Sequence, residues 1–251
     1  MTESQGRATN ALGHDGFTYA SSPQLFHSLE GTGPLIVLPD TSVLIDLVQG
    51  GGDALDELGT VLTDPDGIVF GPVLDGAWGD RRAAIDDVIR LWFWRDIRFY
   101  ISPIYQRDSN KPLDDRRMQE RQRVVDAMAQ DFWSRGGFDQ HSADDDALSA
   151  RAMRGRTPGG TMSLLEHRRW PSGERDALLL REAIEVGCHV FLTEDKGILG
   201  CAETGRAYGL AVLRPAQMLE LLDQAGELST TQAPLLPDLM CMSRYLEMFD
   251  T

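Results

Sequence analysis

The sequence of this 251-residue chain lacks the features that mark several large classes of protein. Its three cysteines, Cys188, Cys201 and Cys241, are odd in number and include no CxxC pair, which argues against a disulfide framework and a zinc site. No apolar run approaches the roughly 18 residues that cross a membrane, and no secretory signal pattern opens the chain. These absences predict a cytoplasmic protein with reduced thiols and no membrane contact.

Positive charge is also scarce. The chain has 24 Lys and Arg against 39 Asp and Glu, for a formal net charge of −15. Such a charge opposes nonspecific attraction to a polyanion. A nucleic-acid partner would therefore require basic residues concentrated at its binding site, or supplied by another protein.

The apolar pattern predicts strands that alternate with helices. The expected strands are 35–38, 97–101, 189–192 and 210–213, with a further strand-like run at 68–70. Residues 35–38 form a short continuous apolar run, which is typical of a strand buried on both faces of a parallel sheet. The expected helices are 43–48, 77–95, 112–134, 143–153, 172–187, 196–208 and 215–224. This alternation predicts a doubly wound α/β fold, in which ligands bind beyond the carboxyl ends of the strands.

The same pattern divides the chain into one domain and two terminal segments. Residues 1–33 are polar, rich in Gly, Ser and Thr, and without clear period, which predicts a peripheral or flexible arm. Residues 34–225 form the predicted domain, with a helical insertion at about 51–95. The tail 226–251 is expected to pack on the domain or on a partner.

Four carboxylates lie at strand ends or helix starts. Asp40 directly follows the first strand, and Asp195 ends a later one. Asp176 lies in the first turn of a helix, and Asp108 follows strand 97–101 by a few residues. In a parallel sheet such positions meet at one rim, where the carboxylates repel one another. A hard cation, Mg²⁺ or Mn²⁺, prefers oxygen ligands and can activate a bound water, so the pattern predicts a metal site.

Each carboxylate also has a purely structural explanation. Asp is a favoured helix N-cap, so Asp40 and Asp195 could each cap the helix that follows. Asp176 could complement the helix dipole, and Asp108 could be a solvated turn residue. The metal-site hypothesis therefore depends on the joint arrangement and not on any one residue.

Two stretches resemble the sequence motifs of PIN-domain ribonucleases. Residues 38–46, LPDTSVLID, are similar to the family's opening strand-to-helix motif. Residues 176–183, DALLLREA, followed by 190–195, VFLTED, resemble its closing motifs, in which Asp opens a helix and Thr-x-Asp ends the next strand. A weaker likeness places Asp108 in the second acidic motif, where the family usually has Glu, with Asp114 or Asp115 as substitutes.

The resemblance implies a three-layer α/β/α sandwich around a parallel sheet and Mg²⁺- or Mn²⁺-dependent endonucleolytic cleavage of RNA by metal-activated water. The ligands it implies are Asp40, Asp108, Asp176 and Asp195. Thr41 and Thr193 would be hydroxyls that orient these carboxylates. Many bacterial relatives are toxins held by an antitoxin, but the insertion at about 51–95 makes this chain longer than those compact proteins.

A basic segment between residues 151 and 170 is a candidate substrate site. Its arginines are Arg151, Arg154, Arg156, Arg168 and Arg169. They could bind RNA phosphates while Trp170 stacks on a base, or they could pair with acidic neighbours at 144–146. An antitoxin or another basic partner could dock on the acidic surface, and an exposed Trp94 would offer a homodimer contact.

Two other functions stay open. A PIN-like module that has lost activity would serve as a binding scaffold, which the imperfect Asp108 motif allows. A phosphatase of the dehalogenase type would use Asp40 as its nucleophile, but such enzymes have a second Asp two residues on, where this chain has Ser42. The sequence favours the ribonuclease.

Overall fold

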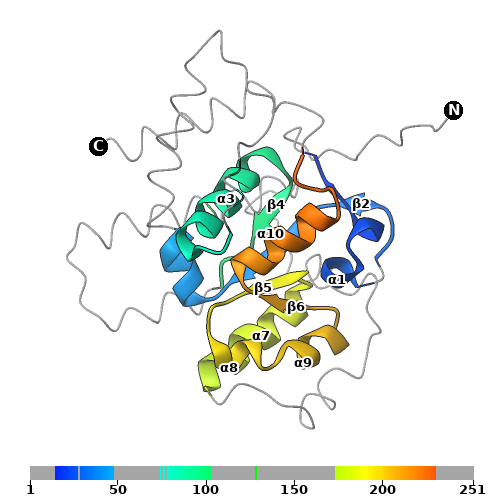
Figure 1. The fold of residues 1–251 in the computed structure, drawn as a ribbon. Coiled ribbons are helices and arrows are strands. Elements are labelled where there is room, and N and C mark those ends of the chain that lie inside the picture. The colour runs from blue at the N-terminus through cyan, green and yellow to red at the C-terminus, as the bar shows by residue number, and fades with distance from the viewer. Residues whose placement is uncertain are drawn as a thin grey trace, which may run out of the picture.

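A parallel sheet forms the centre of the molecule (Figure 1). The computed structural model describes residues 15–27, 29–47, 74, 76, 78–102, 128 and 173–229. Within these ranges the four strands lie in the order β4-β3-β5-β6, all parallel. Their bounds are β3 (Leu35–Pro39), β4 (Ile97–Phe99), β5 (Val190–Leu192) and β6 (Ala211–Leu213). The four predicted strands are therefore confirmed, and they form the expected parallel α/β sheet.

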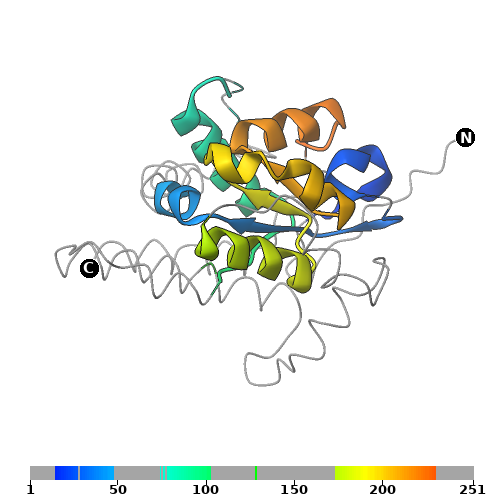
Figure 2. The ribbon, with the colours of Figure 1, turned by 90° about the horizontal axis from the view of Figure 1, so that it is seen from below.

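Helices cover both faces of this sheet. Their bounds are α1 (Pro23–Phe26), α3 (Arg81–Trp94), α7 (Glu174–Val186), α8 (Lys196–Leu199), α9 (Ala202–Ala207) and α10 (Pro215–Gln224), with a further helix at 41–47. Figure 2 shows α7 on one side of the sheet and α3 with α10 on the other. No helix in the described ranges is long and apolar enough to cross a bilayer.

Alternating side chains explain why both faces are buried. Leu35 and Val37 join the hydrophobic core shared with α3 and α10, whereas Leu38 and Phe191 join the one shared with α7. Successive strand residues point to opposite faces, so a continuous apolar run supplies two cores at once.

Helix bounds differ from the predicted ones where local capping decides them. Helix α3 begins at Arg81 because the Asp80 side chain accepts a hydrogen bond from the Arg82 N–H at 3.4 Å. The single helix expected at 196–208 is two helices, α8 and α9, which are separated at Gly200 and Cys201. Glycine costs about 1 kcal/mol in a helix interior relative to alanine, which favours a break there.

Part of the N-terminal segment packs into the core, contrary to the prediction of a peripheral or flexible arm. Strands β1 (Phe17–Thr18) and β2 (Thr32–Gly33) form an antiparallel pair, joined through the 3₁₀ helix η1 (Tyr19–Ser21) and α1. The core includes Phe17, Leu25 and Phe26. Elements this short leave no periodic signal, so the sequence pattern could not reveal them.

A buried arginine joins this N-terminal segment to the C-terminal end of the described chain. Arg95 is fully buried, and its guanidinium donates to the carbonyls of Asp15 at 3.2 Å and Gly16 at 2.8 Å. It also donates to the Glu227 carboxylate at 2.8 Å. Glu227 in turn accepts from Ser21 Oγ at 3.0 Å. These contacts form a polar clasp around Arg95.

The prediction for Trp94 is wrong. A homodimer contact through Trp94 requires an exposed ring, but Trp94 is 7% exposed and belongs to the same core as Trp92. Two residues separate the end of α3 from the start of β4, and the Trp92 ring contacts Phe99 of that strand with ring centroids 5.8 Å apart. A dimer contact through Trp94 is therefore not supported.

Several predictions concern residues outside the described ranges. These are the helix at 143–153, the first part of the insertion with the strand-like run at 68–70, the tail from 230 onward, and the helix at 112–134 except for Met128, which is helical and buried as predicted.

Replacing Arg95 by methionine should destabilise the protein by about 3–5 kcal/mol, because the buried Glu227 carboxylate loses its charged partner. Urea unfolding would measure this loss. The matched control is Arg181→Met, since Arg181 pairs with Glu185 on the exposed side of α7 and should cost at most about 1 kcal/mol. Equal losses in the two variants would show that the clasp does not stabilise the fold.

Candidate active site

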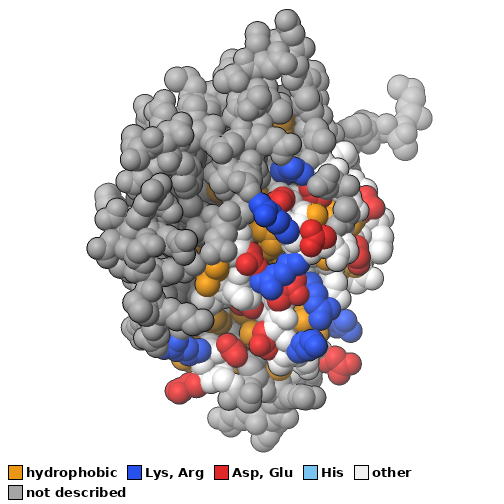
Figure 3. All heavy atoms as spheres, turned by 60° about the vertical axis from the view of Figure 1, so that its left-hand side comes forward, with side chains coloured by type: hydrophobic (Ala, Val, Ile, Leu, Met, Phe, Trp, Pro, Cys, Tyr) orange, Lys and Arg blue, Asp and Glu red, His pale blue; other side chains and the backbone are white. Residues whose placement is uncertain are grey.

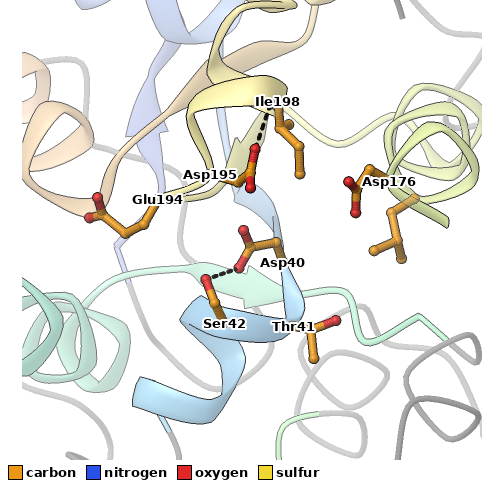
Figure 4. Close-up of a pocket in the computed structure, with 8 residues that line it drawn as sticks. Asp40, Thr41, Ser42, Asp176, Glu194, Asp195 and Ile198 are labelled. Atoms are coloured by element: carbon orange, nitrogen blue, oxygen red, sulfur yellow. Dashed lines mark hydrogen bonds between the residues drawn. The ribbon is translucent and has the colours of Figure 1, made fainter. Parts of the chain in front are cut away.

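A pocket of about 370 Å³ opens where β3 and β5 end and α7 begins (Figure 4). Its lining residues are Asp40, Thr41, Ser42, Asp176, Leu179, Glu194, Asp195 and Ile198. Three of the four predicted carboxylates therefore share one pocket. Figure 4 shows them coming from three separate elements and facing a common space.

Asp40 is held firmly at the end of β3. Its backbone N–H donates to the Leu192 carbonyl at 2.7 Å, which continues the pairing of β3 with β5. Its Oδ1 accepts from the Val43 N–H at 2.7 Å and from Ser42 Oγ at 2.8 Å. Asp40 is thus an N-cap of helix 41–47, as the structural explanation predicted. A carboxylate has about four acceptor positions, so capping leaves capacity for a further ligand.

Thr193 connects two of the carboxylates. Its hydroxyl is fully buried, donates to Asp40 Oδ2 and accepts from the Asp195 N–H, the latter at 3.0 Å. This is the contact that an orienting hydroxyl requires. Thr41, the other predicted hydroxyl, lines the pocket at the first turn of helix 41–47.

Asp195 caps the next helix at the same rim. Its Oδ1 accepts from the N–H groups of Gly197 at 2.6 Å and Ile198 at 3.0 Å. A Cβ on Gly197 would lie 2.9 Å from that oxygen, so a side chain at this position would displace the carboxylate from its cap. The glycine therefore permits the observed position of Asp195.

Asp176 lies in the first turn of α7 and faces the other two. Burial raises the pKa of its carboxyl group above the ordinary value, and the charges of Asp195 and Asp40 raise this pKa further. A Cβ on Gly173 would lie 2.8 Å from Asp176 Oδ2, so glycine permits this close approach as well. The negative charges of Asp40 and Asp195 therefore repel that of Asp176 in the shared pocket.

The donor chemistry of the pocket suits a hard divalent cation. Oxygen atoms are its only metal-binding atoms, as Mg²⁺ and Mn²⁺ prefer, and neither His nor Cys lines it. In the part of the chain that the structure describes, no three His, Cys, Asp or Glu side chains are gathered closely enough to hold an ion together. Mg²⁺ retains several waters and needs one or two carboxylates, so the residues fit an ion bound partly through water.

The remaining predicted site residues lie outside the described ranges. They are Asp108 with its substitutes Asp114 and Asp115, and the basic group Arg151, Arg154, Arg156, Arg168 and Arg169.

Glu194 and Ser42 line the pocket and were not among the predicted site residues. Glu194 stands between Thr193 and Asp195 at the exit of β5, so its place in the sequence was a usable signal. Ser42 could have been inferred from its position at the start of the helix that Asp40 caps.

Removing the Thr193 hydroxyl should cost about 1–3 kcal/mol of unfolding free energy, because the buried Asp40 oxygen and the Asp195 N–H both lose a partner. The change is Thr193→Val, which keeps the shape of the side chain, and urea denaturation measures it. Thr193→Ser is the matched control, since it retains the hydroxyl. If Thr193→Val is as stable as the unmodified protein, the hydrogen bonds of Thr193 contribute nothing.

Asp176→Asn should raise the melting temperature near pH 7 in EDTA. Because the folded-state pKa is raised, the native protein binds the proton more tightly than the unfolded chain does, and this contribution to stability falls as pH rises from the ordinary value of 3.8 through the folded pKa. The advantage of asparagine should therefore shrink as pH is lowered through the same interval.

Glu174→Gln is the control for this experiment, since Glu174 lies in the same helical turn and is exposed. It removes a charge that favours the helix dipole and should not stabilise the protein. A melting temperature for Asp176→Asn at or below that of the unmodified protein would contradict the electrostatic repulsion described above.

Compared with known proteins, the chain matches no family model, no curated protein and no solved structure. The case for a function therefore rests on the pocket and its residues.

Proposed function

We propose that the chain is a divalent-metal-dependent endoribonuclease of the PIN type, which cleaves RNA phosphodiester bonds with a metal-activated water. The observation that carries this proposal is the meeting of Asp40, Asp176 and Asp195, from three separate elements, in one pocket beyond the carboxyl ends of the strands. That is where ligands bind in parallel α/β sheets.

The electrostatics of Asp176 favour a functional explanation over a structural one. Asp40 and Asp195 each accept hydrogen bonds as helix caps, whereas Asp176 carries a pKa raised first by burial and then by the charges of Asp195 and Asp40. Arrangements that raise the pKa of an acid by crowding are typical of active sites. A bound cation would turn this repulsion into attraction.

The finer description of the fold belongs to this proposal. Helices on both faces of the sheet, with β3 and β5 in its centre, support a three-layer α/β/α sandwich of the PIN type. The resemblance of residues 38–46 and 176–195 to PIN motifs adds to that support, since these are the segments that form the pocket.

Each pocket residue would have its own role in such a reaction. The cation, when bound, would lower the pKa of a coordinated water and stabilise charge on the attacked phosphate. Asp176 and Asp195 would hold it, in part through water, while Asp40, oriented by Thr193, would accept from a coordinated water through Oδ2. Ser42 and the Val43 N–H keep Asp40 from rotating away.

A binding module without activity is the second candidate. The cap bonds of Asp40 and Asp195 favour it, because both residues have a structural role that would persist without catalysis. A phosphatase with Asp40 as nucleophile is less favoured, since Ser42 occupies the place of the required acid and donates to Asp40. The Mg²⁺ or Mn²⁺ cofactor, an antitoxin-type partner, a homodimer and a cytoplasmic location remain predictions.

The ribonuclease hypothesis predicts cleavage of single-stranded RNA by the purified chain in Mn²⁺ or Mg²⁺ and none in excess EDTA. Asp40→Asn and Asp195→Asn should each slow cleavage by about 100-fold or more, equivalent to roughly 2.7 kcal/mol of activation free energy. Asparagine still caps a helix, so folding should survive both changes. Cleavage that persists in EDTA, or in both variants, would refute the proposal.

Metal binding measured without RNA distinguishes the ribonuclease from the inactive binding module. At a Mn²⁺ concentration of about 100 times the dissociation constant, the native protein should gain roughly 2.7 kcal/mol of stability. Asp176→Asn should lose most of this gain, and Glu174→Gln should keep it. A chain that neither gains stability from Mn²⁺ nor cuts RNA would be a binding module.

A further inference from the structure

Glu194 differs from the three aspartates of the pocket. Figure 4 shows its side chain pointing away from Asp40, Asp176 and Asp195. Its carboxylate forms an ion pair with Arg214 at 3.3 Å, and the two side chains are 23% and 41% exposed. A basic side chain is therefore held at the edge of the acidic pocket by one of the residues that line it.

Arg214 has a fixed backbone and a partly free side chain. It lies between β6 and α10, where its N–H donates to Gln217 Oε1 at 3.0 Å and its carbonyl accepts from the Met218 N–H at 3.1 Å. Strand β6 ends at the same rim as β5, its hydrogen-bonded parallel neighbour. The guanidinium thus projects from a rigid junction beside the pocket.

Several other arginines in the described ranges are bound in pairs away from the pocket. Arg95 belongs to the buried clasp, Arg98 pairs with buried Asp96, and Arg81 pairs with Asp46. On the face seen in Figure 3, basic and acidic side chains lie interspersed over the described part and form no broad field of one sign. On this face of the described part, individual cations near the site are therefore the groups that can attract a phosphate.

We propose that Arg214 binds a backbone phosphate of the RNA substrate at the pocket rim, and that Glu194 holds it there until the phosphate replaces the carboxylate. This inference rests on the proposed ribonuclease function and names the substrate contact of that same site. A phosphodiester accepts two parallel hydrogen bonds from a guanidinium, as a carboxylate does, so one anion can replace the other.

The exchange is energetically easy. An exposed ion pair contributes only about 0–1 kcal/mol, so little is lost when it opens. The phosphate also binds near three aspartates, and the guanidinium of Arg214 reduces the repulsion between these carboxylates and the substrate. Glu194 therefore acts as a competitor of the substrate for Arg214 and not only as part of a salt bridge.

Opposite effects of the two charges test this proposal. Fluorescence anisotropy would measure the binding of a labelled single-stranded RNA to the full chain in Ca²⁺, over a range of salt concentrations. Arg214→Gln should weaken binding by about 3- to 10-fold and reduce the slope of log K against log salt by about 0.7, the loss of one phosphate contact. Glu194→Gln should tighten binding, because it releases Arg214.

A second Arg–Glu pair offers matched controls. Arg181 and Glu185 on α7 are 42% and 56% exposed and pair at 2.8 Å, and neither lines the pocket. Arg181→Gln and Glu185→Gln make the same changes of net charge and should alter binding much less. In a chain that already carries Arg214→Gln, adding Glu194→Gln should tighten binding no more than Glu185→Gln does.

The outcomes separate this proposal from the one on which it rests. If the native chain cleaves RNA but Arg214→Gln binds like Arg181→Gln, or Glu194→Gln weakens binding, the phosphate contact is refuted and the ribonuclease stands. If the native chain neither binds nor cleaves RNA, both proposals fail. In Mg²⁺, the supporting result is a raised KM for Arg214→Gln with kcat nearly unchanged.

Discussion

The pairing of β3 with β5 is the constraint on which the rest of the site depends. The register places Pro39 opposite Leu192, and the Asp40 N–H donates to the Leu192 carbonyl at 2.7 Å. The next residue after Leu192 is Thr193, whose hydroxyl reaches Asp40. A shift of one residue would turn every side chain of the strand to the opposite face of the sheet and would separate Asp40 from Thr193. Fold and site are therefore specified by the same hydrogen bonds.

Capping and metal binding are compatible roles for the aspartates. The N–H groups at the starts of helix 41–47 and α8 fix Asp40 and Asp195, which leaves their carboxylates with little freedom before any ligand arrives. Asp176 is brought against them at the start of α7, where Gly173 leaves room for it. Such an arrangement stores repulsion in the folded protein, and a cation would relieve it.

Two arginine–glutamate ion pairs have different roles because one is buried and the other is partly exposed. The Arg95–Glu227 pair is buried, so separating its charges would leave a carboxylate without solvent, and the pair serves to hold the two ends of the described chain. The Arg214–Glu194 pair is partly exposed, so water can replace either partner and the pair can exchange. In a chain of net charge −15, an exchangeable arginine beside the pocket is a practical way to attract a phosphate.

The sequence by itself predicted the parallel α/β sheet, since short apolar strands such as 35–38 alternate with helical segments along the chain. It also predicted that Asp40, Asp176 and Asp195 meet at one rim, because strand exits and helix starts face the same edge of a parallel sheet. The tertiary structure decided the packing of Phe17 and Phe26, the burial of Trp94 and the pairing of Glu194 with Arg214. These contacts join residues that are distant in the chain or lie in elements of a few residues, so no local period or spacing could encode them.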